Sequence, residues 1–503
     1  MDRLVYYRKV LKKNPAYDKA ITECIDELEK SSYFNKMDET VDKAGKKLKL
    51  HHYLLSWAPV LTEFAAWVLY DAKKRGIKKL YFLSRDAWPI YRAALAIIEG
   101  ASCTGDVNSS SSLKKDDLGL RKTETKYPEL HYLRVSRYAL RIPEMTINKD
   151  LFIDMMFLSG IDVTMRKILQ RGALDENEIQ EFAAILEYND SLDRILTRPE
   201  ILHWKSKAAL HKEKLWPIVR RHSRERLPAT IGYLRQEGML SGDRIAIVDS
   251  GWVGTTQRSL LRLLNYEKPG IRLLGYYFGL YEIPKDMDPD TYKYFYFGPK
   301  GQIKRKVHFS NCLFEAVSSE ASGMTLSYGR NSKKSGNTNG NSSQFHAYEC
   351  ADDRFYPEVA EYGSLNSEYL EMVQPFLEMF ARAYVRNMKL DNGVRISESI
   401  LTKLMAKPDT REAGIYGSLK FCDDVLEGSA QDIAARLSYK DIQNLRLLRK
   451  TLIWLLSKFN IRTADIHESG WIYASIVRCG IHVRWSLMQA RMYNYLMYFR
   501  KSI

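Results

Sequence analysis

The sequence predicts an α/β fold, in which a mostly parallel, doubly wound sheet carries a helical insertion and is followed by an all-helical C-terminal region. Short apolar runs that end in polar loops alternate with helical patterns at 79–100, 130–144 and 244–264. Such alternation is typical of a parallel sheet with helices on both faces. The 503 residues exceed what one compact core usually holds, so two or three folding units are expected.

The first unit, 1–147, combines N-terminal helices with the first half of the α/β domain. The apolar segment 53–70 is interpreted as a buried helix and not as a membrane span, because Glu63 lies at its middle and a charge there is costly in a bilayer. A strand, "KLYFLS", and a helix follow it. The serine-rich stretch 101–127 has no apolar period and is expected to be a mobile excursion.

The rest of the chain divides by pattern into four parts. Residues 148–240 are charged and helical and are predicted to form an insertion or cap, and 241–330 return to the α/β pattern. The low-complexity stretch 331–345 is predicted to be a flexible loop. Apolar residues then recur at helical spacing through 346–503.

Composition limits the partners and the compartment. The formal charge of +16 indicates an acidic partner, such as nucleic acid, an anionic membrane surface or a phosphorylated substrate, or else a generally basic, solvated surface. The six cysteines show no CxxC spacing, and the N-terminal segment lacks the apolar core of a signal peptide. We therefore expect a cytoplasmic protein without a structural zinc site.

The stretch "RIAIVDSGWVGTTQRSLLRLL" carries the strongest chemical signal. Asp249 falls where a buried strand ends, and a turn of small residues leads from there into a helix: Ser250, Gly251, Gly254, Thr255 and Thr256. Free backbone N–H groups and hydroxyls at a helix N-terminus can hold a phosphate, and the acid could hold sugar hydroxyls or magnesium. The alternative is an ordinary N-cap without a ligand. The Walker lysine and the G-x-G-x-x-G pattern are both absent.

Two further strand ends carry similar groups. "YFLSRDAW" places Ser84, Arg85 and Asp86 between a strand and a helix, and "YLRVSRYALR" places three guanidinium groups near the end of another strand, those of Arg134, Arg137 and Arg141. Arginine forks recognise phosphates, although a surface-charge or capping role is an alternative for each motif alone. The three loops meet if their strands are neighbours.

Together these motifs resemble domains of bacterial capsule and O-antigen biosynthesis proteins, which carry the pattern FLSRDG, SRxAL and VDxGWxGTxQ and are often fused to a haloacid-dehalogenase-like phosphatase. The matching residues are 82–87, 136–140 and 248–257, with Ala87 in place of the usual glycine. No strand followed by D-x-D-x-T is present. The resemblance therefore implies that a separate phosphatase acts on any phosphorylated product.

The same segments are similar to type I phosphoribosyltransferases, which implies that fold and phosphoribosyl diphosphate (PRPP) as the donor, with Mg²⁺. The resemblance implies that "YFLSRDA" holds the diphosphate and that Asp249 holds the ribose hydroxyls. It also implies that Gly254, Thr255 and Thr256 hold the 5-phosphate. Ser250 stands where a second acid is usual. Trp252 and Gln257 complete the implied donor site. Asp86 and Asp249 are the candidates for magnesium binding and for the general base, and Arg85 and Arg137 for neutralising the leaving diphosphate.

Two later segments offer further candidates. The segment 308–329 contains Glu315, Ser318 and Tyr328, which the family resemblance assigns to acceptor binding and which could equally belong to a packed helix. "DMDPD" at 286–290 has the D-x-D spacing of metal-dependent glycosyltransferases, but its neighbouring prolines favour a solvated turn.

The C-terminal segment 476–503 is rich in aromatic residues, methionine and arginine. Two interpretations stay open for it: a core-facing helix with a basic outer face, or a helix that rests peripherally on an anionic membrane.

The resulting hypothesis is a phosphoribosyltransferase that moves ribose 5-phosphate from PRPP to a hydroxyl of a glycan or of its lipid-linked precursor, with no nucleic-acid partner. Two alternatives remain: a nucleotide-sugar-dependent glycosyltransferase of polysaccharide assembly, and a non-enzymatic basic protein that binds nucleic acid or acts as a scaffold.

Overall fold

The computed structural model describes residues 2–30, 43–103, 127–158, 163–330, 345–346, 354–360, 366–387, 396–421, 431–444, 449 and 469–502. The excursion expected at 101–127 and the loop expected at 331–345 lie almost entirely outside the described residues.

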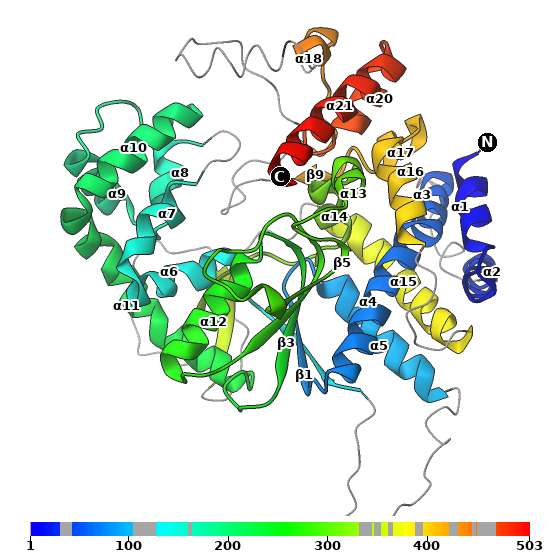
Figure 1. The fold of residues 1–503 in the computed structure, drawn as a ribbon, viewed down its shortest axis with the longest axis horizontal. Helices are drawn as coiled ribbons and strands as arrows, with labels where there is room; N and C mark the ends of the chain where they lie inside the picture. The colour runs from blue at the N-terminus through cyan, green and yellow to red at the C-terminus, as the bar shows by residue number, and fades with distance from the viewer. Residues whose placement is uncertain are drawn as a thin grey trace, which may run out of the picture.

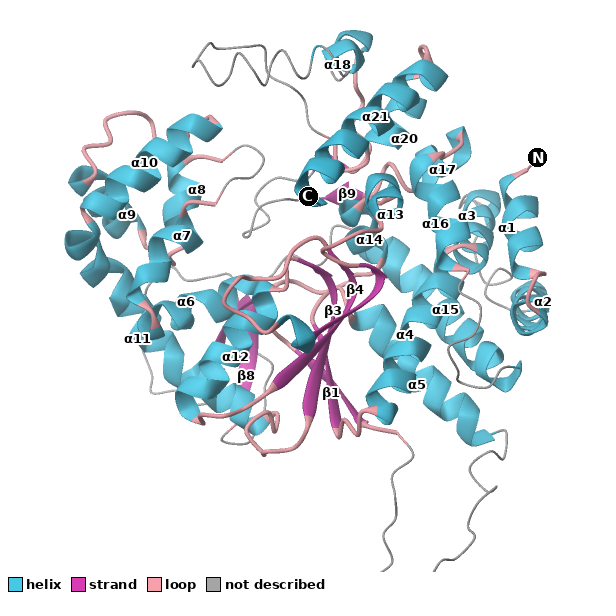
Figure 2. Cartoon of the chain, in the orientation of Figure 1, coloured by secondary structure: helices cyan, strands magenta, loops and turns pink. Residues whose placement is uncertain are grey.

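A five-stranded, fully parallel sheet forms the centre of the molecule (Figures 1 and 2). Its strands stand in the order β2 (Glu129–Leu133), β1 (Lys79–Leu83), β3 (Ile245–Trp252), β4 (Leu273–Leu280) and β5 (Tyr292–Phe297). The α/β class and the parallel sheet predicted from the sequence are therefore confirmed. The pairs Lys79↔Ile245 and Phe82↔Val248 set the register between β1 and β3, so these two strands end side by side.

Helices cover both faces of the sheet, as Figure 2 shows. Successive residues of β3 point to opposite faces: Ala246 and Val248 join one hydrophobic cluster, and Ile245 and Ile247 join the other. The first face packs against α4 (Trp57–Lys74), α5 (Trp88–Cys103) and α15 (Ser367–Asn387), and the second against α6 (Arg137–Ile147), α11 (Lys212–Gln236) and α12 (Thr255–Glu267). Burial on both sides explains why the strands are nearly continuous apolar runs.

The apolar segment at 53–70 is buried helix, as predicted. It spans the end of α3 (Lys43–Leu55) and most of α4, and the Glu63 carboxylate inside α4 accepts the backbone N–H groups of Ile396 (2.9 Å) and Ser397 (3.1 Å). Glu63 therefore caps the start of α16 (Ser397–Ala406). Among the described helices, none has both the length and the apolar character needed to cross a membrane.

The helical insertion forms a separate lobe with its own core, visible beside the sheet in Figure 1. It contains η1 (Lys149–Leu151), α7 (Phe152–Met156), α8 (Met165–Gln170), α9 (Glu176–Ile185), α10 (Arg198–Leu210) and the first half of α11. Leu215 and Val219 of α11 belong to the lobe, whereas Leu227 and Leu234 of the same helix pack on the sheet. One continuous helix thus joins the lobe to the sheet.

The prediction of an all-helical C-terminal region is wrong. The strands β6 (Thr325–Arg330), β8 (Phe355–Ala360) and β7 (Phe345–His346) form an antiparallel sheet in that order, and β9 (Lys420–Phe421) pairs with β10 (Gln431–Asp432). These strands are short, and β6 and β8 pair across the low-complexity segment. Apolar residues recur at helical spacing in the rest of the region, and this pattern concealed the short strands in the sequence.

The remaining described elements surround this centre (Figure 1). They are α1 (Arg3–Leu11), α2 (Pro15–Lys30), η2 (Pro289–Thr291), α13 (Ile303–His308), α14 (Asn311–Val317), α17 (Thr410–Ile415), α18 (Tyr439–Asn444), α20 (Ile472–Cys479) and α21 (Val483–Ser502). The N-terminal helices pack on the C-terminal region: the Tyr17 and Tyr384 rings lie 5.1 Å apart between centroids, and Arg3 pairs with Glu412 at 3.1 Å.

Candidate functional site

The strand order places a topological switch point between β1 and β3. The chain runs from β1 outward to β2 on one side of the sheet and from β3 outward to β4 and β5 on the other. In open parallel sheets, ligands bind in the crevice outside the carboxyl ends of the strands at such a point. The loops after β1, β2 and β3 leave the sheet at this edge, and the expected neighbourhood of the three strands is confirmed.

A cavity of about 240 Å³ lies at this edge. The prediction that the strand ends at Asp249 is wrong, because β3 continues to Trp252 and pairs there with β4. The cavity brings together predicted residues from the loops after β1 and β2, from the last part of β3 and the turn after it, and one from α14: Ser84, Arg85, Asp86, Arg137, Asp249, Gly251, Trp252, Gly254, Thr255, Thr256 and Glu315. Residues more than 200 positions apart in the chain therefore share one space.

Three carboxyl groups gather in this cavity. The Ser250 hydroxyl donates to Asp86 Oδ2 at 3.0 Å, and the Ser250 backbone N–H donates to Asp249 Oδ1 at 2.9 Å. The Trp252 indole N–H donates to Glu315 Oε1 at 2.6 Å. Ser250, which replaces the acid that the family resemblance leads one to expect, is buried and links the carboxyl groups of the first and third loops.

The surroundings of the cluster raise the pKa of two of its carboxyl groups, those of Asp249 and Glu315. Burial, and next the charge of Asp86, raise the pKa of Asp249 to about 7, against the lowering effects of the Ser250 N–H and of Arg137. Burial and Asp86 also raise the pKa of Glu315 well above its usual range, while the Trp252 hydrogen bond and Arg137 oppose that shift. Carboxyl groups that titrate near neutrality in a cavity are typical of functional sites.

Arg137 is the cation that faces this cluster. Its side chain is exposed and, within the described part of the chain, makes no hydrogen bond or ion pair. A guanidinium in this state is available for an anionic ligand.

The N-terminus of α12 opens onto the same cavity without a side-chain cap. Its N-cap is Gly254, at φ +65°, and neither Asp249 nor a threonine caps the helix, so the N-cap interpretation of this loop is wrong. Gly254 is required by its backbone and by packing, because a Cβ there would lie 2.3 Å from the Tyr292 ring. The helix dipole and free N–H groups favour an anion at this point.

Further positive charge lies behind this helix end. The Arg141 guanidinium donates to Thr255 Oγ1 at 3.2 Å, and burial together with the neighbouring Arg137 lowers the pKa of Arg141 to about 10. A buried guanidinium whose charged form is further disfavoured by a neighbouring cation indicates a site that gains from a bound anion.

Hydrogen bonds connect the loop after β1 to the loop after β2. The Ser84 hydroxyl donates to the Val135 carbonyl at 2.6 Å and accepts the Val135 N–H at 2.9 Å, while Arg85 donates to the Ser322 carbonyl at 3.3 Å. The Ser84–Arg85 and Gly251–Trp252 peptide bonds are both cis.

Five other predicted residues lie behind the cavity wall. Arg134 pairs with Glu320 at 2.6 Å, and the hydroxyl of Tyr328 donates to the Arg134 carbonyl. The Ser318 hydroxyl donates to the Asp86 carbonyl at 2.8 Å, and the buried Gln257 amide donates to the Leu273 carbonyl at 2.9 Å. Arg141, described above, is the fifth. These side chains hold the loops in place and do not line the cavity.

The "DMDPD" segment is an exposed turn, as its prolines indicated. Asp286 pairs with Arg262 at 2.6 Å, and Asp288 accepts the Asp290 N–H at 2.9 Å at the start of η2. These acids are engaged in holding the turn.

Several lining residues carried no signal in the sequence. They are Asn366, Lys420 and Phe421, which come from the C-terminal region. The Asn366 amide bonds the Lys420 backbone in both directions, at 3.0 and 2.8 Å, and Lys420 pairs with Asp432 at 2.7 Å. No motif surrounds these residues, so only the tertiary structure could identify them.

Asp86 and Asp249 are suited to Mg²⁺ in the way that this ion usually binds. Mg²⁺ takes one or two carboxylates together with waters and substrate phosphates. Within the described residues no group of three or more His, Cys, Asp or Glu forms a metal-binding cluster of protein ligands alone. The two aspartates, bridged by Ser250, would therefore act together with a phosphorylated ligand.

Comparison with known proteins finds no match: neither a family model nor a curated protein matches this chain.

Proposed function

We propose that this protein is a phosphoribosyltransferase of the type I kind that transfers ribose 5-phosphate from PRPP to a hydroxyl of a glycan in cell-surface polysaccharide synthesis. The observation that carries the proposal is the meeting of the three motifs at the β1/β3 switch point, where an uncapped helix N-terminus, the exposed Arg137 guanidinium and three carboxyl groups share one cavity. Such a site offers separate places for a phosphate, a diphosphate and sugar hydroxyls.

Each part of the donor has a place in this arrangement. The 5-phosphate would occupy the N-terminus of α12, with the Thr255 and Thr256 hydroxyls beside it, and Asp249 would hold the ribose hydroxyls. Arg85 and Arg137 would neutralise the diphosphate. When bound, Mg²⁺ supplies additional positive charge for the leaving group.

The reaction breaks the bond between ribose C1 and the diphosphate oxygen and forms a bond from C1 to the acceptor oxygen. The diphosphate leaves with the bonding electron pair, and the acceptor hydroxyl gives its proton to a carboxylate. Asp249, with a pKa of about 7, is half ionised near neutrality and can accept that proton, as can Asp86. Glu315 belongs on the acceptor side of this scheme. The product keeps its 5-phosphate, which a separate phosphatase would remove.

Donor binding provides the test. PRPP with Mg²⁺ should raise the melting temperature of the protein more than any of a panel of nucleotide sugars, because only PRPP fills both anion positions. A larger rise with a nucleotide sugar would instead support the glycosyltransferase alternative. Salt-sensitive binding to generic DNA or RNA, without a PRPP effect, would support the nucleic-acid alternative.

We also propose that α21 contacts an anionic membrane, where lipid-linked acceptors are presented. Leu487 and Ala490 pack inward, whereas large apolar side chains at helical spacing are exposed on the outer face: Trp485, Met488, Met492, Tyr495, Leu496 and Phe499. Every charged residue of α21 is an arginine or a lysine. Two such helices would repel each other, so the charge favours an anionic lipid surface over a second copy of the chain.

A further inference from the structure

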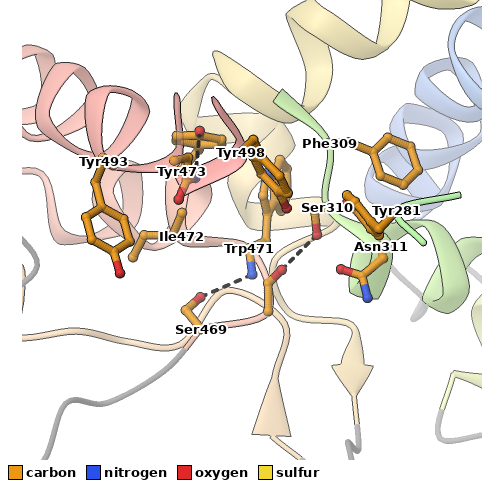
Figure 3. Close-up of a pocket in the computed structure, with 13 residues that line it drawn as sticks. Tyr281, Phe309, Ser310, Asn311, Ser469, Trp471, Ile472, Tyr473, Tyr493 and Tyr498 are labelled. Carbon is orange, nitrogen blue, oxygen red and sulfur yellow. Dashed lines mark hydrogen bonds between the residues drawn. The ribbon is translucent and has the colours of Figure 1, made fainter. Parts of the chain in front are cut away.

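Figure 3 shows a second cavity, of about 290 Å³. Its walls come from α20, α21, the start of α14 and the ends of loops: Tyr281, Phe309, Ser310, Asn311, Ser469, Gly470, Trp471, Ile472, Tyr473, Ala490, Tyr493, Asn494 and Tyr498. In Figure 3, Phe309 and Asn311 lie on one side of the cavity and Tyr473 and Tyr493 on the other. Its volume corresponds to roughly ten water molecules, which is room for a sugar residue.

The lining is aromatic and polar but carries no charged side chain. Aromatic faces are electron-rich and attract the polarised C–H groups on one face of a sugar ring. Amides and hydroxyls bond the hydroxyls at the edge of that ring. An anionic ligand would find no cation here, so the chemistry selects a neutral, polyhydroxylated molecule.

Much of the polar lining is already engaged within the protein, and two amide groups remain for a ligand. The Tyr473 hydroxyl donates to the Val307 carbonyl at 2.7 Å and accepts the Asn494 Nδ2–H group at 3.1 Å. This leaves Asn494 Oδ1 and Asn311 Nδ2 without a hydrogen-bond partner among the described residues. One acceptor and one donor are therefore presented by two amides, of which that of Asn494 is anchored by its bond to Tyr473.

The aromatic arrangement does not suit a nucleobase. A nucleobase binds to aromatic side chains by stacking on their faces. The rings of Tyr281 and Tyr498 in this cavity are nearly parallel, with 9° between their planes, and they stack on each other at 5.6 Å between centroids. No slot is left between these rings.

The second cavity adjoins the first through one aromatic wall and one helix. Trp252 lines the first cavity and packs at 5.1 Å from Phe309 and 6.2 Å from Tyr281, which line the second. On α14, Asn311 faces the second cavity and Glu315, one turn later, faces the first. The two cavities therefore lie on opposite sides of the wall that Trp252 and Phe309 form.

We propose that this second cavity binds a neutral sugar residue of the acceptor glycan. Its role as an acceptor site rests on the proposed function, whereas its selectivity for a neutral sugar rests on the lining alone.

Saturation-transfer NMR on the full chain tests the sugar site directly. The probes are the methyl glycosides of glucose, galactose, mannose, rhamnose and N-acetylglucosamine, with adenosine as the comparison. At least one glycoside should bind at millimolar concentration. Tyr498→Leu and Asn311→Leu should each weaken that binding about fivefold or more, the loss expected for one removed hydrogen bond or ring contact.

Tyr495→Leu is the matched control, because Tyr495 lies on the same helix, is 50% exposed and does not line the cavity. Its glycoside binding should equal that of the wild type. The proposal is overturned if no glycoside binds, if both cavity variants bind as well as the control, or if adenosine displaces the glycosides. Should Tyr498→Leu fail to fold, Asn311→Leu decides.

The PRPP melting shift, measured on the same proteins, separates the two proposals. Glycoside binding without a PRPP shift would remove the proposed transfer reaction and leave the sugar site. A PRPP shift without glycoside binding would overturn the sugar site alone.

Discussion

Replacing Asp249 with asparagine should stabilise the fold at high pH and abolish donor binding. The folded chain holds the proton of this carboxyl more tightly than the unfolded chain does, since its pKa moves from 3.8 to about 7 on folding. The free energy of unfolding therefore falls progressively as the pH rises from about 3.8 to about 7. Above that range the loss of stability is complete. Asparagine has nearly the same size and cannot ionise.

The magnitude follows from the shift of about three pKa units. At about 1.4 kcal/mol per unit, Asp249→Asn should raise the free energy of unfolding by about 2 kcal/mol at pH 5 and about 4 kcal/mol at pH 8. Urea unfolding followed by tryptophan fluorescence at both pH values measures the difference. A stabilisation of this kind is typical of residues kept for function at the expense of stability.

The exposed Asp243 provides the control. Its pKa is lowered by hydrogen bonds from Ser241 and Lys79, so Asp243→Asn should give no gain at pH 8. Equal gains for Asp249→Asn at pH 5 and pH 8, or a lower stability at pH 8, would refute the account of the carboxyl cluster. Retained PRPP affinity in Asp249→Asn would separately refute its role in holding ribose.

Four other predictions concern the same regions. Arg137→Gln should weaken PRPP binding about tenfold or more by calorimetry, with little change in melting temperature, because the charge-assisted contact of Arg137 is made only to the ligand. The control Arg198→Gln, on the helical lobe, should leave both PRPP binding and the melting temperature unchanged. Thr255→Val should also weaken PRPP binding while the fold persists; unchanged affinity would leave the loop without a ligand role. Gly254→Ala should lower the free energy of unfolding by more than about 2 kcal/mol, and by more than Gly301→Ala, which has a similar φ but open space around it. Vesicles containing phosphatidylglycerol should bind the wild type and not Met492→Asp, whereas Leu202→Asp, at an exposed apolar position outside α21, should bind as the wild type does.

The part of the site that could be predicted from sequence is the part carried by strand ends. "KLYFLSRDA" and "IAIVDSGW" each place an acid within three residues of a buried run, and parallel strands bring such positions to one edge of the sheet. The direction of a side chain within that edge could not be predicted. Arg137 faces the cavity while Arg134, three residues earlier in the same motif, turns away to Glu320. The difference depends on the neighbours that each side chain meets, and these come from distant parts of the chain.

What the sequence determined by itself is local: the α/β class, the buried nature of α4 and the three strand-end loops, because hydrophobic period and loop composition act over a few residues. Only the tertiary structure decided the contacts between distant segments. It pairs β6 with β8, brings Lys420 and Asn366 to the cavity wall, and makes Ser250 the link between Asp86 and Asp249. It also sets a neutral aromatic cavity beside the charged one. These features depend on surfaces formed only when the folded elements pack together, and no local pattern encodes them.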